Sequence, residues 1–243
     1  GRRDIMFHID ASQLDHRQLN EQIRHCPEDL MITGCLGQRF IGAGAEQGHL
    51  EISGVPGNAL GAYLNGACIE VRGNAQDAVG DTMNAGRIIV HGSIGDAAGY
   101  AMRGGEIYVQ GDAGYRAGIH MKAYGDKWPT LVIGGTAGSF LGEYQAGGII
   151  LVLGLSQTGR SIVSNFPCTG MHGGKLCLRS ACKDLRLPRQ VQARPAGEED
   201  LAEIGRYVQN YCVFFGGDWS DIMAAPFTVI TPDIQTPYRQ MYV

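Results

Sequence analysis

The chain lacks the features of membrane-spanning, secreted and nucleic-acid-binding proteins. Its longest apolar runs, such as residues 147–155, are far too short to cross a bilayer. Residues 1–8 contain two arginines but no apolar signal-peptide core follows them. The formal net charge of −4 and the pI of about 6.0 leave no electrostatic footprint for nucleic acid or anionic lipid. We therefore expect a cytoplasmic protein that binds neither.

Signatures of common reactive sites are also missing. The seven cysteines include no CxxC pair, and an odd number in a non-secreted chain favours reduced thiols. The nearest approach to a metal pattern is Cys168, Cys177 and Cys182, spaced by eight and then four residues. Iron–sulfur clusters usually need tighter groups of thiolates. We interpret the three as buried structural thiols, with Cys177 at an inward-facing strand position, and keep cluster ligation as the alternative.

Glycine, by contrast, is abundant, and its 37 residues recur with a regular period. Two series have a spacing of 19 residues: Gly54, Gly73, Gly92 and Gly111, and Gly61, Gly80, Gly99 and Gly118. Three apolar series share that spacing: Leu50, Ile69, Ile88 and Ile107; Ile52, Val71, Val90 and Val109; and Leu64, Met83, Met102 and Met121. The first two alternate with mostly polar residues, which is typical of a β-strand with one buried face. The chain therefore contains a repeat that stacks on itself.

The repeat continues in both directions, with two interruptions. Five extra residues fall at Tyr124–Pro129 and seven between Leu155 and Gly170, and the phase resumes after each. Upstream, Leu30 and Ile32 begin an earlier coil that is one residue out of step. Insertions that preserve the phase of a solenoid protrude as loops. We expect these two to be contacts with partners.

These observations predict an all-β fold, a single-stranded right-handed parallel β-helix of about seven coils over residues 30–180. We favour the right-handed form because left-handed hexapeptide helices prefer multiples of six residues. Residues 1–29 form an N-terminal strand and helix cap, and residues 181–243 a C-terminal helix and extended tail. Helices are predicted over 16–26, capped by Asp15 or Ser12, and over 198–215, ended by Gly216. The second has an apolar stripe of Leu201, Ile204, Val208, Tyr211 or Cys212, and Phe215.

Both flanks are expected to cap the ends of the solenoid, where strand edges and an apolar cross-section would otherwise be exposed. The tail 226–243 is too apolar for a free linker, so we expect it to lie extended against the solenoid or a partner.

Candidate chemistry on the coils is sparse. His91 is an outward strand residue, and His120 and His172 stand at coil corners, so all three are interpreted as exposed. The glycines of 42–48 have the wrong spacing for a dinucleotide loop, and no P-loop lysine follows. Asp77 and Asp96 form a row beside Asn58, near Asp81, and with Arg103 they keep a carbohydrate-active enzyme open as an alternative. We assign no catalytic, cofactor-binding or metal-binding residue.

Residues 73–122, GNAQDAVGDTMNAGRIIVHGSIGDAAGYAMRGGEIYVQGDAGYRAGIHMK, closely resemble the GXGXG β-helix domain of glutamate synthases. The resemblance continues through IGGTAGSFLGEYQAGGIILVLGL (133–155) and TGMHGGKLCLR (169–179), and LGQRFIGAG (36–44) is similar to the entry of that domain. The chain resembles the free-standing form of the domain, a separate subunit in archaea and some anaerobic bacteria. The C subunit of formylmethanofuran dehydrogenase and its related formyltransferase complex is a more distant likeness.

The resemblance implies a division of labour. In the family, an amidotransferase hydrolyses glutamine, ammonia adds to 2-oxoglutarate, and a flavin mononucleotide (FMN) and iron–sulfur part reduces the product to glutamate. The resemblance thus implies a non-catalytic scaffold in nitrogen metabolism, in a hetero-oligomer with amidotransferase and FMN/iron–sulfur synthase subunits. No cofactor is expected on this chain. The alternatives are a scaffold in a formylmethanofuran dehydrogenase-like complex and a carbohydrate-active β-helix.

Overall fold

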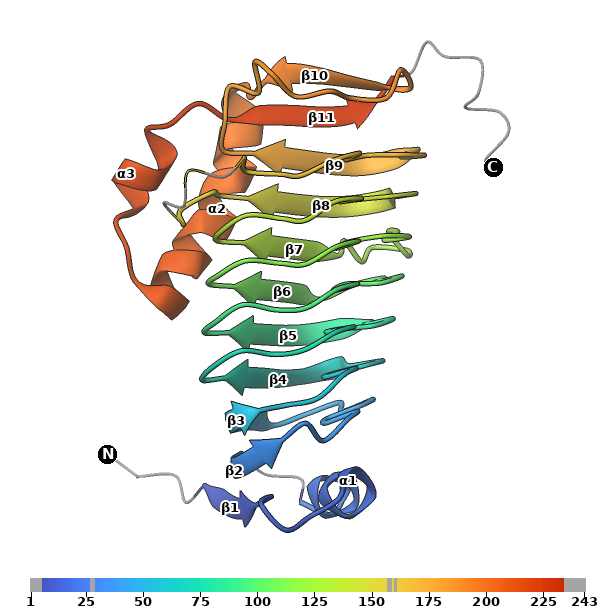
Figure 1. Cartoon of the computed structure of the whole chain (residues 1–243), viewed down its shortest axis with the longest axis vertical. Helices are drawn as coiled ribbons and strands as arrows, with labels where there is room; N and C mark the ends of the chain where they lie inside the picture. Colours follow the sequence, from blue (N-terminus) through green and yellow to red (C-terminus); the bar gives the residue numbers. More distant parts are fainter. Residues whose placement is uncertain (1–5, 27–28, 157–158, 160, 234–243) are drawn as a thin grey trace.

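The computed structural model describes residues 6–26, 29–156, 159 and 161–233. Their elements, shown in Figure 1, are β1 (Phe7–Asp10), α1 (His16–Arg24), β2 (Leu30–Leu36), β3 (His49–Val55), β4 (Asn65–Val71), β5 (Ala85–Val90), β6 (Glu106–Val109), β7 (Thr130–Ile133), β8 (Ala146–Val152), β9 (Gly173–Leu178), β10 (Val191–Pro195), α2 (Glu198–Phe215), α3 (Trp219–Met223) and β11 (Thr228–Pro232). The eleven strands form one sheet in the order β1 to β9, then β11, then β10. The predicted parallel β-helix is confirmed, with eight stacked coil strands, β2 to β9, rather than about seven.

The strand register confirms the repeat and both insertions. Ile69 pairs with Ile88, one period away, whereas Ile107 pairs with Leu131 and Ile150 with Leu176, across the five-residue and seven-residue insertions. The early coil is out of step because a register shift follows Ile32 in β2. The paired side chains are fully buried and form the interior core. Stacking at about 4.8 Å therefore places identical positions of the repeat directly above one another.

Each coil that begins with one of the strands β2 to β8 turns through three residues with positive φ. In one coil these are Ala59, Gly61 and Tyr63, with φ values of 61°, 65° and 57°. Their N–H groups point alternately to the next coil and the previous one: Ala59 N donates to Asp77 O, Gly61 N to Ile41 O and Tyr63 N to Asp81 O. This alternation lets a turn without strand structure bond to both neighbouring coils.

The N-terminal end is capped as the sequence predicts. Asp15 accepts from the backbone N–H of Arg17 and Gln18, and the Gln18 side chain accepts from Asp15 N, which completes a capping box. The helix ends at Arg24, two residues before the predicted end. Leu19 and Ile23 pack into the end of the interior core, and β1 pairs with β2.

The predicted C-terminal helix is confirmed as α2, but it does not cap the end of the solenoid. It lies along the outer face of the sheet, where Ile204, Val208 and Tyr211 are buried against a second core that includes Val132 and Leu151. Leu201, expected in the buried stripe, is 36% exposed. The end is closed instead by β11, which pairs antiparallel with β9, and by β10, which pairs antiparallel with β11. No helix in the described ranges is long and apolar enough to span a bilayer.

The position of α2 explains a row of outward residues that the alternating pattern treats as mostly polar. Outward positions on β6 to β9 are apolar and buried: Tyr108, Val132, Leu151 and Cys177. The inward assignment of Cys177 was therefore wrong. Its neighbours Leu176 and Leu178 point into the interior core, and Cys177 points outward beneath α2. In the tail, residues 228–232 are extended against β9, and residues 234–243 lie outside the described part.

Candidate functional site

The acidic row proposed for a carbohydrate enzyme is a ladder between coils. Asn58 Oδ1 accepts from Asp77 N at 3.0 Å, Asp77 Oδ1 from Asp96 N at 2.7 Å, and Asp96 Oδ1 from Tyr115 N at 2.8 Å. Each side chain therefore satisfies a backbone N–H of the following coil, which a turn without regular pairing leaves unbonded. The arrangement accounts for Asn and Asp at this spacing without a substrate.

A second ladder runs beside the first, three residues earlier in each coil, and was missed in the sequence. Asn74 Oδ1 accepts from Ser93 N at 2.8 Å, Ser93 Oγ from Asp112 N at 3.0 Å, and Asp112 Oδ1 from Thr136 N at 2.8 Å. The signal was present as short polar residues at 19-residue spacing. Asp112 Oδ1 also accepts from the Ser156 hydroxyl at 3.0 Å, which fixes the start of the second insertion.

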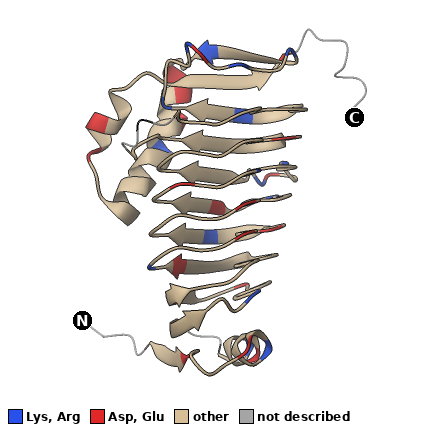
Figure 2. Cartoon of the chain, viewed as in Figure 1, with Lys and Arg blue, Asp and Glu red and all other residues tan. Residues whose placement is uncertain are grey.

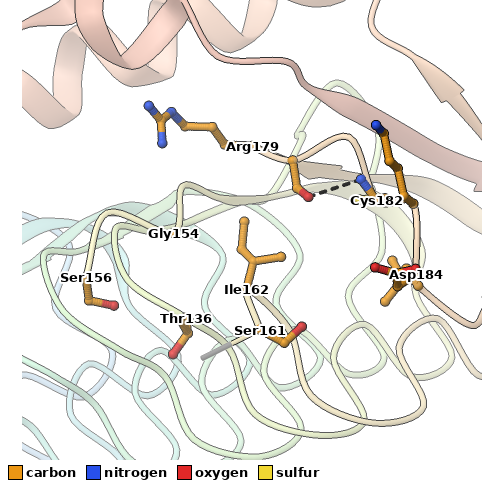
Figure 3. Close-up of a pocket in the computed structure, with 11 residues that line it drawn as sticks. Thr136, Gly154, Ser156, Ser161, Ile162, Arg179, Cys182 and Asp184 are labelled. Carbon is orange, nitrogen blue, oxygen red and sulfur yellow. Dashed lines mark hydrogen bonds between the residues drawn. The ribbon is translucent and has the colours of Figure 1, made fainter. Parts of the chain in front are cut away.

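A cavity of about 300 Å³ opens where this ladder ends (Figure 3). Its walls come from the second insertion and from the segment after β9, and its lining includes Thr136, Ser161, Ile162, Arg179, Ser180 and Asp184. Several polar groups are already engaged: Arg179 Nε donates to Ile222 O at 2.8 Å, and Ser180 Oγ accepts from Cys182 N at 3.1 Å. These hydrogen bonds hold the surrounding segments together, so we interpret the cavity as a gap between packed loops and not as a binding site.

An ionic network occupies the part of the outer face that α2 leaves uncovered. Glu70 is its centre: Oε1 lies 2.7 Å from His91 Nε2 and 3.2 Å from Arg72 Nη2, and Oε2 lies 3.3 Å from His49 Nε2. Arg72 also pairs with Glu51 at 2.9 Å. His91, expected to be exposed, has a side chain only 16% exposed because this network and Phe215 enclose it.

The network continues along the sheet to the end of α2. Arg87 on β5 pairs with Glu106 on β6 at 2.7 Å. Together with Glu70 on β4, these residues give three neighbouring strands an acidic, a basic and an acidic side chain in turn (Figure 2). The Tyr108 hydroxyl donates to Glu106 at 2.9 Å and accepts from Asn210 Nδ2 at 3.0 Å, while Phe214 lies against Arg87. Burial raises the pKa of Tyr108, so the hydroxyl stays protonated and links the sheet to the helix. The polar row thus anchors the last turns of α2.

The three cysteines do not converge. Cys168 is buried in the interior core, Cys177 is buried beneath α2, and Cys182 is half-buried beside the cavity. Burial raises the pKa of the Cys168 and Cys177 thiols to about 12, which disfavours the thiolate that a metal would need. Within the described ranges no group of three or more His, Cys, Asp or Glu side chains could hold a metal ion. The arrangement supports structural thiols over cluster ligation.

The corner histidines differ from each other. His120 is exposed as expected, and its ring stacks on Tyr144 at a centroid distance of 5.3 Å and meets Tyr100 edge-on at 5.8 Å. His172 is half-buried, with Nδ1 3.1 Å from Gly170 O. His120 therefore belongs to a line of exposed aromatic side chains along one edge of the solenoid.

Two comparisons with known proteins bear on this architecture. Residues 16–233 match the model of the GXGXG motif family. An uncharacterized protein of Methanocaldococcus jannaschii is 41% identical over 248 residues, an alignment that covers 96% of this chain and 95% of that protein. The glycine lattice, the stacked register and these matches agree, and the chain belongs to the GXGXG family.

Proposed function

We propose that this chain is a non-catalytic scaffold subunit of a glutamate synthase-type complex, which converts glutamine and 2-oxoglutarate to glutamate. The family to which the chain belongs occurs in glutamate synthase. In this proposal an amidotransferase subunit and an FMN/iron–sulfur synthase subunit carry the reactions, in the cytoplasm, and the solenoid holds them in a fixed relation.

One observation supports the scaffold role above others: the candidate reactive side chains Asp77, Asp96 and His91 are engaged in holding the solenoid together. Asp77 and Asp96 bond to backbone N–H groups, and His91 and Glu70 pair with each other. Two adjacent ladders between the coils and α2 on the outer face make a stiff body. A stiff body with a long outer surface is what is needed to keep separate catalytic subunits at a constant distance.

Affinity purification of the tagged full chain from its native cells tests the proposal. We expect co-purification of a glutamine amidotransferase and an FMN-containing iron–sulfur protein in fixed stoichiometry. The flavin and iron of the complex should elute with those partners after dissociation, leaving the chain colourless. Recovery of molybdopterin or formyl-transfer proteins would identify the formylmethanofuran dehydrogenase-like alternative. A lone chain that turns over a polysaccharide would overturn the scaffold role.

A further inference from the structure

The first insertion forms a hydrogen-bonded projection. Tyr124 N donates to Lys127 O at 3.2 Å and Lys127 N to Tyr124 O at 3.0 Å, which closes a two-residue hairpin with Gly125 at φ +59°. This is the geometry of a tight hairpin with glycine at its first central position. The hairpin folds back on the coil below, where a Cβ on Gly104 would come within 3.1 Å of Lys127 Cδ. The projection visible beside β7 in Figure 1 is thus held by backbone bonds and packing.

Two large aromatic side chains on this projection are left in solvent. Tyr124 is 64% exposed and Trp128 is 41% exposed. Ala123, the residue before Tyr124, lies against Gly147, three residues after Tyr144, so the hairpin leaves the solenoid at the coils that carry the exposed stack of Tyr100, His120 and Tyr144. We name these five side chains, Tyr100, His120, Tyr124, Trp128 and Tyr144, the aromatic edge. Tyrosine and tryptophan on a preordered surface are the commonest anchors of protein interfaces, since they bury much area and lose little conformational freedom.

The charges around the aromatic edge indicate the chemistry of its partner. Arg103, Lys122 and Lys127 are exposed, and none of them forms an ion pair with a described residue. The carboxylates beside them are Asp126 in the hairpin and Glu143, next to Tyr144, which already pairs with Arg116 at 3.8 Å. This local excess of positive charge stands on a chain of net charge −4. Three cations are too few to neutralise the phosphates along a nucleic-acid backbone, which disfavours a nucleic acid as the partner. Exposed aromatic anchors bind best in an apolar pocket, which a protein surface can supply.

We propose that the aromatic edge is the docking surface for a protein subunit that presents acidic side chains around an apolar pocket. Tyr124 and Trp128 enter the pocket, and Arg103, Lys122 and Lys127 pair with the acidic rim. The inference rests on the proposed function in one respect: it assigns the partner to the same assembly as the scaffold.

The test is a binding measurement between the full chain and the partner subunit purified from the native complex. Tyr124→Ala/Trp128→Ala is the test variant. Tyr63→Ala is the matched control, because Tyr63 is 59% exposed at the same position of the repeat as Tyr144, in an N-terminal coil. We expect the double variant to raise the Kd at least about 30-fold, the usual effect of removing an interface anchor, and the control to leave it unchanged. Far-ultraviolet circular dichroism and the thermal midpoint verify that each variant is folded.

A second set of variants tests whether the partner surface around the pocket is acidic. Lys122→Glu/Lys127→Glu should weaken the association and flatten its dependence on salt, while Lys183→Glu, at an exposed site near the cavity, should not. A folded double alanine variant that binds every partner with unchanged Kd overturns the docking surface and leaves the scaffold proposal intact. An acidic partner lost in that variant but unrelated to glutamate synthesis supports the surface and overturns the proposed function. Self-association through the edge, or capture of a nuclease-sensitive partner, also overturns the inference.

Discussion

Replacing Gly118 by alanine separates two reasons for glycine at the coil corner. Gly118 has φ +69°, and a Cβ there would lie 2.3 Å from Ile150 Cδ1 in a neighbouring coil. Gly99, the equivalent residue one coil earlier, has φ +66°, but a Cβ there would meet nothing closer than 3.7 Å. Alanine itself occupies the left-handed region at Ala59, with φ 61°. At Gly118 the close approach of Ile150 therefore adds a packing cost to the cost of the left-handed backbone conformation.

The magnitudes follow from the two contributions. A left-handed alanine costs about 1–2 kcal/mol, which is the expected loss of unfolding free energy for Gly99→Ala. Forcing a Cβ into a filled site adds about 1–3 kcal/mol, so Gly118→Ala should lose about 2–5 kcal/mol in total. Ile150→Val removes the opposing Cδ1 methyl at a cost of about 0.5–1.5 kcal/mol on its own. Placed in the Gly118→Ala background, it should restore stability instead of lowering it further.

The assay is equilibrium denaturation by guanidinium, followed by far-ultraviolet circular dichroism, on the four proteins of the Gly118/Ile150 cycle and on Gly99→Ala. A positive coupling of about 0.5–3 kcal/mol between the two sites is expected. Equal losses for Gly99→Ala and Gly118→Ala, or an Ile150→Val cost that is the same in both backgrounds, would refute the reasoning.

Three further outcomes are expected. Asp112→Ala should lower the unfolding free energy by about 1–3 kcal/mol because Thr136 N–H loses its acceptor, whereas Asp112→Asn keeps an oxygen there and should cost less; denaturation curves compare them. Val208→Asp buries a charge beneath α2 and should release the helix from the sheet, seen as rapid proteolysis within 198–215 while the strand signal persists. Burial raises the native pKa of Cys168 and Cys177 to about 12 from 9.0, so above pH 9 the unfolded state loses protons that the native state keeps. The unfolding free energy should therefore fall between about pH 9 and 12, and fall less in a Cys168→Ala/Cys177→Ala variant; an identical fall in both proteins would contradict this.

The coil architecture could be predicted from sequence because stacking makes every contact repeat at one period. Leu50 and Ile69 pair in the same row regardless of how distant parts of the chain pack. An insertion only increases the number of residues before the next residue of that row. The start of α1 and the end of α2 were equally local: Asp15 caps α1 through bonds to its own first turn, and Gly216 follows the last residue of α2.

What could not be predicted depends on how separate parts pack. The outward row changes from Glu51 and Glu70 to Val132 and Leu151, which in retrospect indicates a cover over the C-terminal coils. The pattern of one strand does not say whether α2 supplies that cover, because its apolar stripe would fit either the end or the side of the solenoid. For the same reason His91 was expected in solvent, although Glu70 and Phe215 enclose it.

The central claim, that the solenoid couples catalytic subunits without performing chemistry, is tested most directly by reconstitution. Purified amidotransferase and synthase partners are mixed with and without the full chain, and glutamate formed from glutamine and 2-oxoglutarate is measured. The account predicts no product from the chain alone, and glutamine-dependent synthesis that rises when the chain joins its partners. Equal rates with and without the chain, or product from the chain alone, would contradict it.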